Sequence, residues 1–84
     1  MNLIKNYTEF KIKTICNRLG IKNWSINSNE LVDVNGDVSL SDRKLTKLPL
    51  KFGTVVGSFW CNNNQLITLE GAPKIVRGDF YCFR

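Results

Sequence analysis

The sequence contains no histidine, and its three cysteines are an odd number among 84 residues. Without histidine, a Ser–His or Cys–His catalytic pair and a mixed cysteine–histidine zinc site cannot be built. An odd cysteine count argues against a disulfide framework, so we expect Cys61 and Cys82 to be small buried thiols in a reducing compartment. A Gly-rich phosphate loop with its lysine is also missing. We therefore expect no enzyme, no metal and no cofactor.

Long apolar segments are missing as well. No apolar run approaches the roughly 20 residues that a membrane span needs, and residues 1–6 lack the apolar stretch and cleavage site of a secretory signal. The hydrophobic content of 43% over 84 residues fits one small folded domain. The net charge of +5 favours an acidic partner or nucleic acid on electrostatic grounds.

What the sequence does contain is a pattern that recurs every 21 residues. GDVSL at 36–40 aligns with GSFWC at 57–61 and with GDFYC at 78–82. A fixed period of this length, with apolar residues held in place, is typical of leucine-rich repeats. We therefore expect an α+β fold, in which a short leucine-rich-repeat-like β-solenoid of parallel strands follows an N-terminal capping helix.

The chain is expected to divide into five segments of one domain, residues 1–84. These are a capping helix (1–20), an irregular first repeat (21–35), two full copies of the pattern (36–56 and 57–77) and a truncated third copy (78–84). Gly20 is predicted to close the helix in a left-handed conformation. An apolar stripe at helical spacing is expected to cover one end of the stack; it consists of Ile4, Ile12, Ile15, Cys16 and Leu19.

Within each copy, strand alternation predicts which side chains enter the core. Val38 and Leu40 are expected to point inward. Asn64 is expected to bond free backbone groups of its loop, a role that Arg43 cannot fill in the first copy. Asp37 and Asp79 share a register, and we expect them to bond nearby turn amides.

The outward side chains form a column of the predicted sheet made of Ser39, Trp60 and Tyr81. A second column contains Ser41, Asn62 and Phe83, and the expected basic rim consists of Arg77, Arg84 and Lys47. Three interpretations stay open for these aromatic residues: a protein interface, a platform for unpaired bases, or aromatic pairs that pack only on each other.

The predicted helix carries a second candidate contact patch on the face opposite its apolar stripe. That face contains Tyr7, Phe10, Lys11, Thr14 and Arg18. The alternative is that Phe10 packs against the following loop and that the cations are simply solvated.

The third copy ends after its strand, so we expect an unpaired edge over residues 78–84. This edge is predicted to pair with a second copy of the chain, giving a homodimer, or with a target, and to bury Phe80 and Phe83.

Four stretches carry a resemblance: DVNGDV (33–38), KLTKLPLKF (44–52), CNNNQL (61–66) and LEGAPK (69–74). They resemble a family of small bacteriophage proteins with leucine-rich-like repeats behind a short helix. The resemblance implies a phage origin, action in the host cytoplasm and a non-enzymatic repeat fold, and it implies no catalytic or ligand residues.

These observations together favour a phage-encoded, non-catalytic binding protein that antagonises a host factor, such as a defence nuclease or the toxin of a toxin–antitoxin pair. The alternatives are an RNA- or single-strand-binding module and a minor structural protein of the virion.

Overall fold

The computed structural model describes residues 3–82, and for residues 3–7 it describes the backbone alone. The chain begins with helix α1 (Leu3–Leu19) and continues into seven short strands. These are β1 (Trp24–Ile26), β2 (Val32–Val34), β3 (Val38–Ser39), β4 (Phe52–Val55), β5 (Phe59–Trp60), β6 (Ile75–Val76) and β7 (Phe80–Tyr81). The expected α+β class with an N-terminal helix and parallel strands is confirmed.

Helix α1 ends as the sequence predicts. Gly20 has a φ of 74°, in the left-handed region. Its N–H donates to the carbonyl of Asn17, and the N–H of Ile21 donates to the carbonyl of Cys16. This pair of bonds is a Schellman motif, which satisfies carbonyl groups that the last helical turn leaves free. The turn directs Ile21 back into the core, where it is buried.

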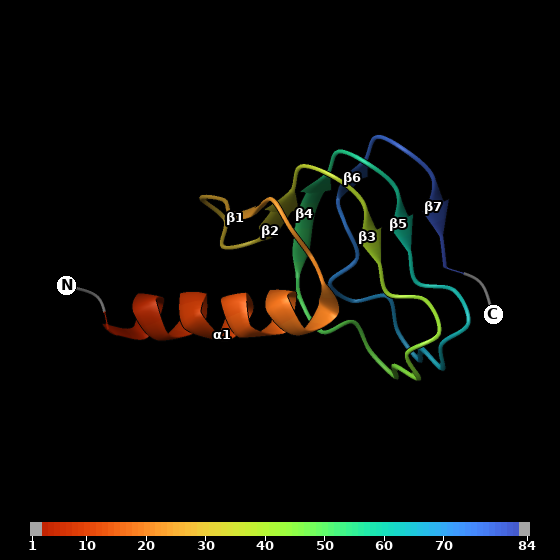
Figure 1. Cartoon of the computed structure of the whole chain (residues 1–84), viewed down its shortest axis with the longest axis horizontal. Helices are drawn as coiled ribbons and strands as arrows, with labels where there is room; N and C mark the ends of the chain where they lie inside the picture. The colour runs from red at the N-terminus through yellow and green to blue at the C-terminus, as the bar shows by residue number, and fades with distance from the viewer. Residues whose placement is uncertain (1–2, 83–84) are drawn as a thin grey trace.

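The strands form two sheets, one on each side of a shared core (Figure 1). The first sheet has the order β1-β2-β4-β6, and the second has the order β3-β5-β7. In the second sheet, Val38 pairs with Phe59 and Phe59 with Phe80, in parallel. The recurring residues of consecutive copies therefore lie side by side, as their spacing predicts.

Two features of the first sheet differ from the sequence-based expectation. Strand β1 pairs with β2 in the antiparallel direction, with Trp24 opposite Val34, so residues 21–35 contain a hairpin instead of a parallel first repeat. Residues 27–31 are too few for the crossover that a parallel pair requires. The return segment of both full copies also forms a strand, β4 in the first and β6 in the second. Phe52 and Val55 of β4 are fully buried and lie opposite residues of β2.

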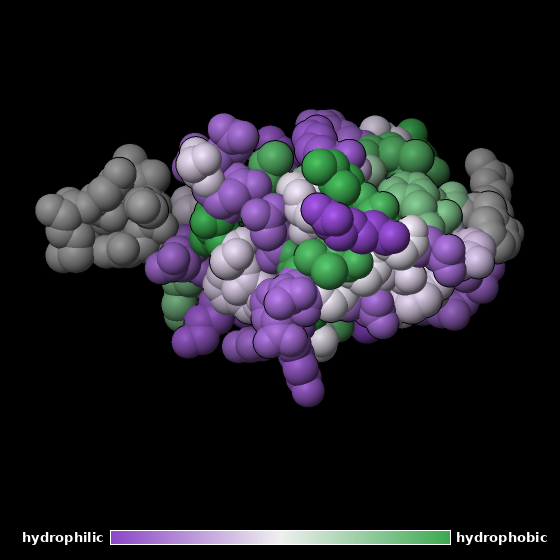
Figure 2. Space-filling view, turned by 90° about the horizontal axis from the view of Figure 1, so that it is seen from above, coloured by the Kyte–Doolittle hydropathy of each residue, from purple (hydrophilic) through white to green (hydrophobic). Residues whose placement is uncertain are grey.

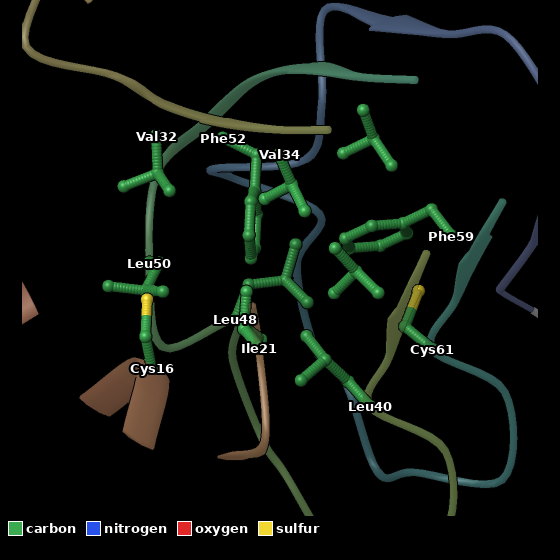
Figure 3. Packing of buried hydrophobic residues seen from close by; sticks show 12 residues of the cluster. Cys16, Ile21, Val32, Val34, Leu40, Leu48, Leu50, Phe52, Phe59 and Cys61 are labelled. Carbon is green, nitrogen blue, oxygen red and sulfur yellow. The ribbon is translucent and has the colours of Figure 1, made fainter. Parts of the chain in front are cut away.

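The core lies between the two sheets and against one side of α1 (Figure 3). The rings of Phe52 and Phe59, one from each sheet, meet edge to face with centroids 5.2 Å apart. Ile12, Ile15 and Leu19 of the helix pack on this cluster, so the predicted apolar stripe is confirmed for these residues. The buried set is Cys16, Ile21, Val32, Val34, Val38, Leu40, Leu48, Leu50, Phe52, Val55, Phe59 and Cys61.

Crowding explains two of the three recurring glycines, Gly57 and Gly78. A Cβ added to Gly57 would collide with the carboxylate of Asp37, and one added to Gly78 would lie 2.6 Å from Oγ of Ser58. In each case, the polar side chain of the preceding copy occupies the space that a side chain would need. Only glycine therefore allows the copies to approach this closely.

Candidate binding surfaces

Consecutive copies are joined by a ladder of side-chain bonds along the turn before each strand of the second sheet. Asp37 Oδ1 accepts a hydrogen bond from the N–H of Ser58 at 2.8 Å. Oγ of Ser58 then accepts one from the N–H of Asp79 at 2.9 Å. In the first sheet, Oδ1 of Asp33 accepts from the N–H of Thr54 in the same way. The prediction that Asp37 bonds a turn amide is confirmed, and its carboxylate has a structural role.

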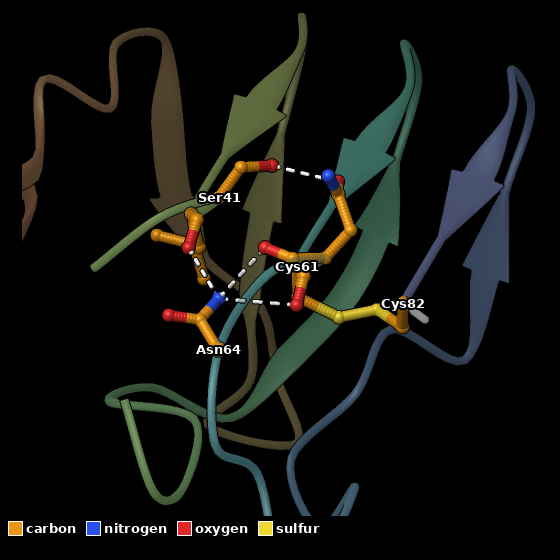
Figure 4. The surroundings of a disulfide bond; sticks show 6 residues. Ser41, Cys61, Asn64 and Cys82 are labelled. Carbon is orange, nitrogen blue, oxygen red and sulfur yellow. Dashed lines mark hydrogen bonds between the residues drawn. A yellow bond between two sulfur atoms is a disulfide. The ribbon is translucent and has the colours of Figure 1, made fainter. Parts of the chain in front are cut away.

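Asn64 holds the loops that follow β3 and β5 (Figure 4). Its Oδ1 accepts bonds from the N–H groups of Arg43 and Leu45, each at 3.0 Å. Its Nδ2 donates to the carbonyl oxygens of Leu40, Cys61 and Asn62. The predicted role of Asn64 is therefore confirmed, and it extends to the preceding copy.

Arg43, at the corresponding position of the first copy, does something different. Its guanidinium donates to the carbonyl of Leu19 at the end of α1. The arginine that replaces asparagine in the first copy therefore connects this copy to the helix.

A disulfide joins Cys61 of the second copy to Cys82 of the third (Figure 4). The expectation of two free thiols is therefore wrong. The parallel register places both Cα atoms 4.5 Å apart, within the range that a disulfide can bridge. The third cysteine, Cys16, is free and buried, and burial raises the pKa of its thiol. Equal spacing of the two cysteines in the repeat was the signal that could have revealed the pair.

The predicted outward column lies on the second sheet. Ser39 pairs with Trp60, and Trp60 pairs with Tyr81. Ser39 is exposed, Trp60 is half-buried and Tyr81 is 41% exposed. In the neighbouring column, the hydroxyl of Ser41 donates to Oδ1 of Asn62 at 2.7 Å.

Of the predicted basic rim, only Arg77 is described near this column along the chain. Arg77 is exposed in the turn that leads into β7, close in sequence to Tyr81. Lys47 instead lines a groove beside the helix. Phe83 and Arg84 lie outside the described residues.

The helix patch is separate from this column. Phe10 is 65% exposed, so the alternative in which it packs against the following loop is wrong. Arg18 is exposed in the last turn of α1, and Lys11 borders the groove. The backbone of Tyr7 is helical, but its side chain is outside the described part. Figure 1 shows α1 and β7 toward opposite ends of the long axis, so the described residues of the two predicted patches form no single site.

The groove is a feature that sequence analysis missed. It has a volume of about 600 Å³ and lies between α1 and the segment that contains Leu48 and Leu50. Its floor is apolar and includes Ile12 and Ile15, and three lysines and two glutamates line it as well.

Further properties of the described residues bear on function. Within residues 3–82, no group of three or more histidine, cysteine or carboxylate side chains has an arrangement that could hold a metal ion. No helix in this part of the chain has the length and apolar character needed to cross a membrane. Comparisons with protein-family models, curated proteins and solved structures find no match.

Proposed function

We propose that this chain is a non-catalytic binding protein built as a short leucine-rich-like stack, and that it binds a protein target through the column formed by Trp60 and Tyr81. The observation that carries the proposal is the outward placement of two large aromatic side chains on consecutive strands, with Tyr81 41% exposed. Tryptophan, tyrosine and arginine are the residues that most often dominate binding energy at protein interfaces. Arg77 adds an exposed guanidinium in the turn beside this column.

The distribution of charge supports a protein target at this surface more than a nucleic acid. Between residues 57 and 82 there are two cations, Lys74 and Arg77, and two carboxylates, Glu70 and Asp79. The surplus behind the net charge of +5 therefore lies outside this segment. Binding of nucleic acid depends largely on cations that neutralise phosphates, so an electroneutral surface favours a protein partner.

The resemblance to small bacteriophage proteins supports a narrower proposal. In this proposal, the target is a host factor, such as a defence nuclease or a toxin, which is held in a stoichiometric complex in the host cytoplasm. The disulfide between Cys61 and Cys82 argues against a permanently reducing compartment, because such bonds are rare there. Localisation of the protein in infected cells is therefore part of the test.

The decisive experiment is affinity capture from bacterial cells, with and without nuclease treatment, followed by titration of the purified target. The test variant combines Trp60→Ala and Tyr81→Ala, and the matched control is Phe10→Ala, which removes an exposed aromatic side chain from the helix. We expect a complex that survives nuclease and that is weakened at least tenfold by the double substitution only. Equal effects of the two variants, with folding intact by circular dichroism, would refute the proposed surface.

RNA binding is the second candidate, and the net charge of +5 favours it. Exposed aromatic side chains stack on unpaired bases with about 1–3 kcal/mol per base. In this case the capture is lost after nuclease treatment, and the affinity falls steeply with added salt because phosphate contacts release counterions. A salt-insensitive complex that resists nuclease excludes this candidate.

A further inference from the structure

Positions that are buried in one copy become exposed in the next at the end of the stack formed by β6 and β7. Leu48 is 8% exposed, whereas Leu69, at the same position of the next copy, is 49% exposed. Phe59 is fully buried, whereas Phe80 is 44% exposed although its ring stacks on that of Phe59 at 5.6 Å. Among the described residues, no further strand covers this end.

The same end presents the open edges of both sheets. Strands β6 and β7 are the last strands of their sheets in the described chain (Figure 1). In the covered copies, the N–H of Val38 donates to Ser58 and that of Phe59 donates to Asp79. The equivalent N–H of Phe80 points toward the open side by the same parallel geometry. Open edges of this kind pair readily with another chain.

This surface, which we call the end face, consists of Leu69, Ile75, Phe80 and the edges of β6 and β7. Ile75 is 54% exposed, and Figure 2 shows hydrophobic surface gathered toward the C-terminal half of the molecule. A hollow of about 230 Å³ adjoins it, next to Cys82 and bordered by Ile67, which is 86% exposed. A protruding apolar side chain beside a hollow is a shape that a two-fold contact can use on both copies.

The charges around the end face are compatible with a second copy of the chain as its partner. Among the described residues from 57 to 82, the exposed charged side chains are Glu70, Lys74, Arg77 and Asp79, which balance each other. A second copy can therefore approach this end without like-charge repulsion, even though each chain carries a net charge of +5. Within the described residues, the carboxylate of Asp79 accepts no amide bond like the one that Asp37 accepts two copies earlier, so the expectation that Asp79 bonds a turn amide is wrong.

We propose that the end face is the interface between two copies of this chain. A two-fold axis that lies in the face and crosses the strands brings β7 against β7 of the second copy in the antiparallel direction. Phe80 and Leu69 of each copy then enter a shared apolar layer. An interface of this type closes at two chains, because a two-fold contact uses the end face of both copies.

The cross-section of the molecule limits the strength of this contact. Its two shorter extents of 24 and 20 Å give the end a flat cross-section of about 480 Å² per copy. Stable interfaces usually bury about 800 Å² per partner, so a weak dimer in rapid exchange is expected.

Analytical ultracentrifugation of the full chain, from about 10 μM to about 1 mM, tests the proposal in the range of such weak contacts. We expect the mass to rise from 9.6 kDa toward that of a dimer. Ile75→Lys and Phe80→Lys should each weaken association about a hundredfold, because a two-fold interface contains the changed residue twice. The control Phe10→Lys, at the other end of the molecule, should associate like the wild type.

Three outcomes would overturn the proposal. These are a wild-type chain that stays monomeric throughout, an assembly that grows beyond two chains, and a Phe10→Lys variant that dissociates as fully as Ile75→Lys. Where Phe80→Lys fails to fold, the wild-type dilution series together with Ile75→Lys and Phe10→Lys keeps the proposal testable. Target binding through Trp60 and Tyr81 is measured separately by titration, so either proposal can fail without the other.

Discussion

Replacing Asn64 with alanine removes a side chain that makes five hydrogen bonds to two consecutive copies. Two N–H groups lose their acceptor and three carbonyl oxygens lose a donor. A protein hydrogen bond contributes a net 0.5–1.5 kcal/mol, and water replaces part of these bonds at a half-buried site, so we expect a loss of about 3 kcal/mol. For a chain of this length, that is a large share of a total stability of roughly 4–12 kcal/mol.

Thermal unfolding followed by circular dichroism measures this loss. A change of about 3 kcal/mol should lower Tm by roughly 12–24 °C in a domain of this size. Asn29→Ala is the matched control, because the exposed Asn29 side chain makes no hydrogen bond within residues 3–82. Asn27→Ala, which removes three bonds to Asn29, Leu31 and Asp33, should fall between the two.

The chemical identity of the bonds is tested by Asn64→Asp. The carboxylate keeps the acceptor for two N–H groups, but at pH 7 it faces the carbonyl oxygens of Leu40, Cys61 and Asn62. We expect at least the loss seen with alanine at pH 7, and a partial recovery when the carboxylate is protonated in acid. If Asn64→Ala costs no more than Asn29→Ala, the side chain does not hold the copies together.

Three further predictions follow from the same contacts. Thiol titration of the unreduced chain in denaturant should find one reactive cysteine, and detection of three thiols would contradict the disulfide. Cys61→Ser should lower the free energy of unfolding by roughly 3 kcal/mol in chemical denaturation, as expected for a disulfide that closes a loop of 21 residues. Gly57→Ala should lower the free energy of unfolding by about 1–3 kcal/mol, because the added methyl group collides with Asp37. This loss should be smaller when Asp37→Ala is also present, and a double-mutant cycle without coupling would refute the crowding argument. Burial raises the pKa of the Cys16 thiol in the folded state, so the contribution of the neutral thiol to stability is fully present below the ordinary thiol pKa and is lost as the pH rises toward the folded-state value. Urea midpoints of the wild type and Cys16→Ala, compared from neutral to alkaline pH, should show this additional loss of stability only in the wild type.

The sequence alone determined which residues are neighbours across consecutive copies. The 21-residue spacing predicted that Val38, Phe59 and Phe80 lie on adjacent parallel strands, and alternation predicted that Trp60 faces away from the core. Gly20 predicted the helix end in the same direct way. These features depend on local chemistry and on the repeat, and both are visible in the order of residues.

Other features were decided only by the tertiary structure. A hairpin formed at β1 and β2 because the short turn leaves no room for a crossover, and this direction is not encoded in the apolar pattern of the strands. The repeat spacing makes Cys61 and Cys82 neighbours, but whether they form a disulfide depends on the distance between their Cα atoms, which is 4.5 Å in the structure. The exposed state of Phe80 depends on what lies beyond it in space, because the same apolar side chain is buried one step earlier, at Phe59.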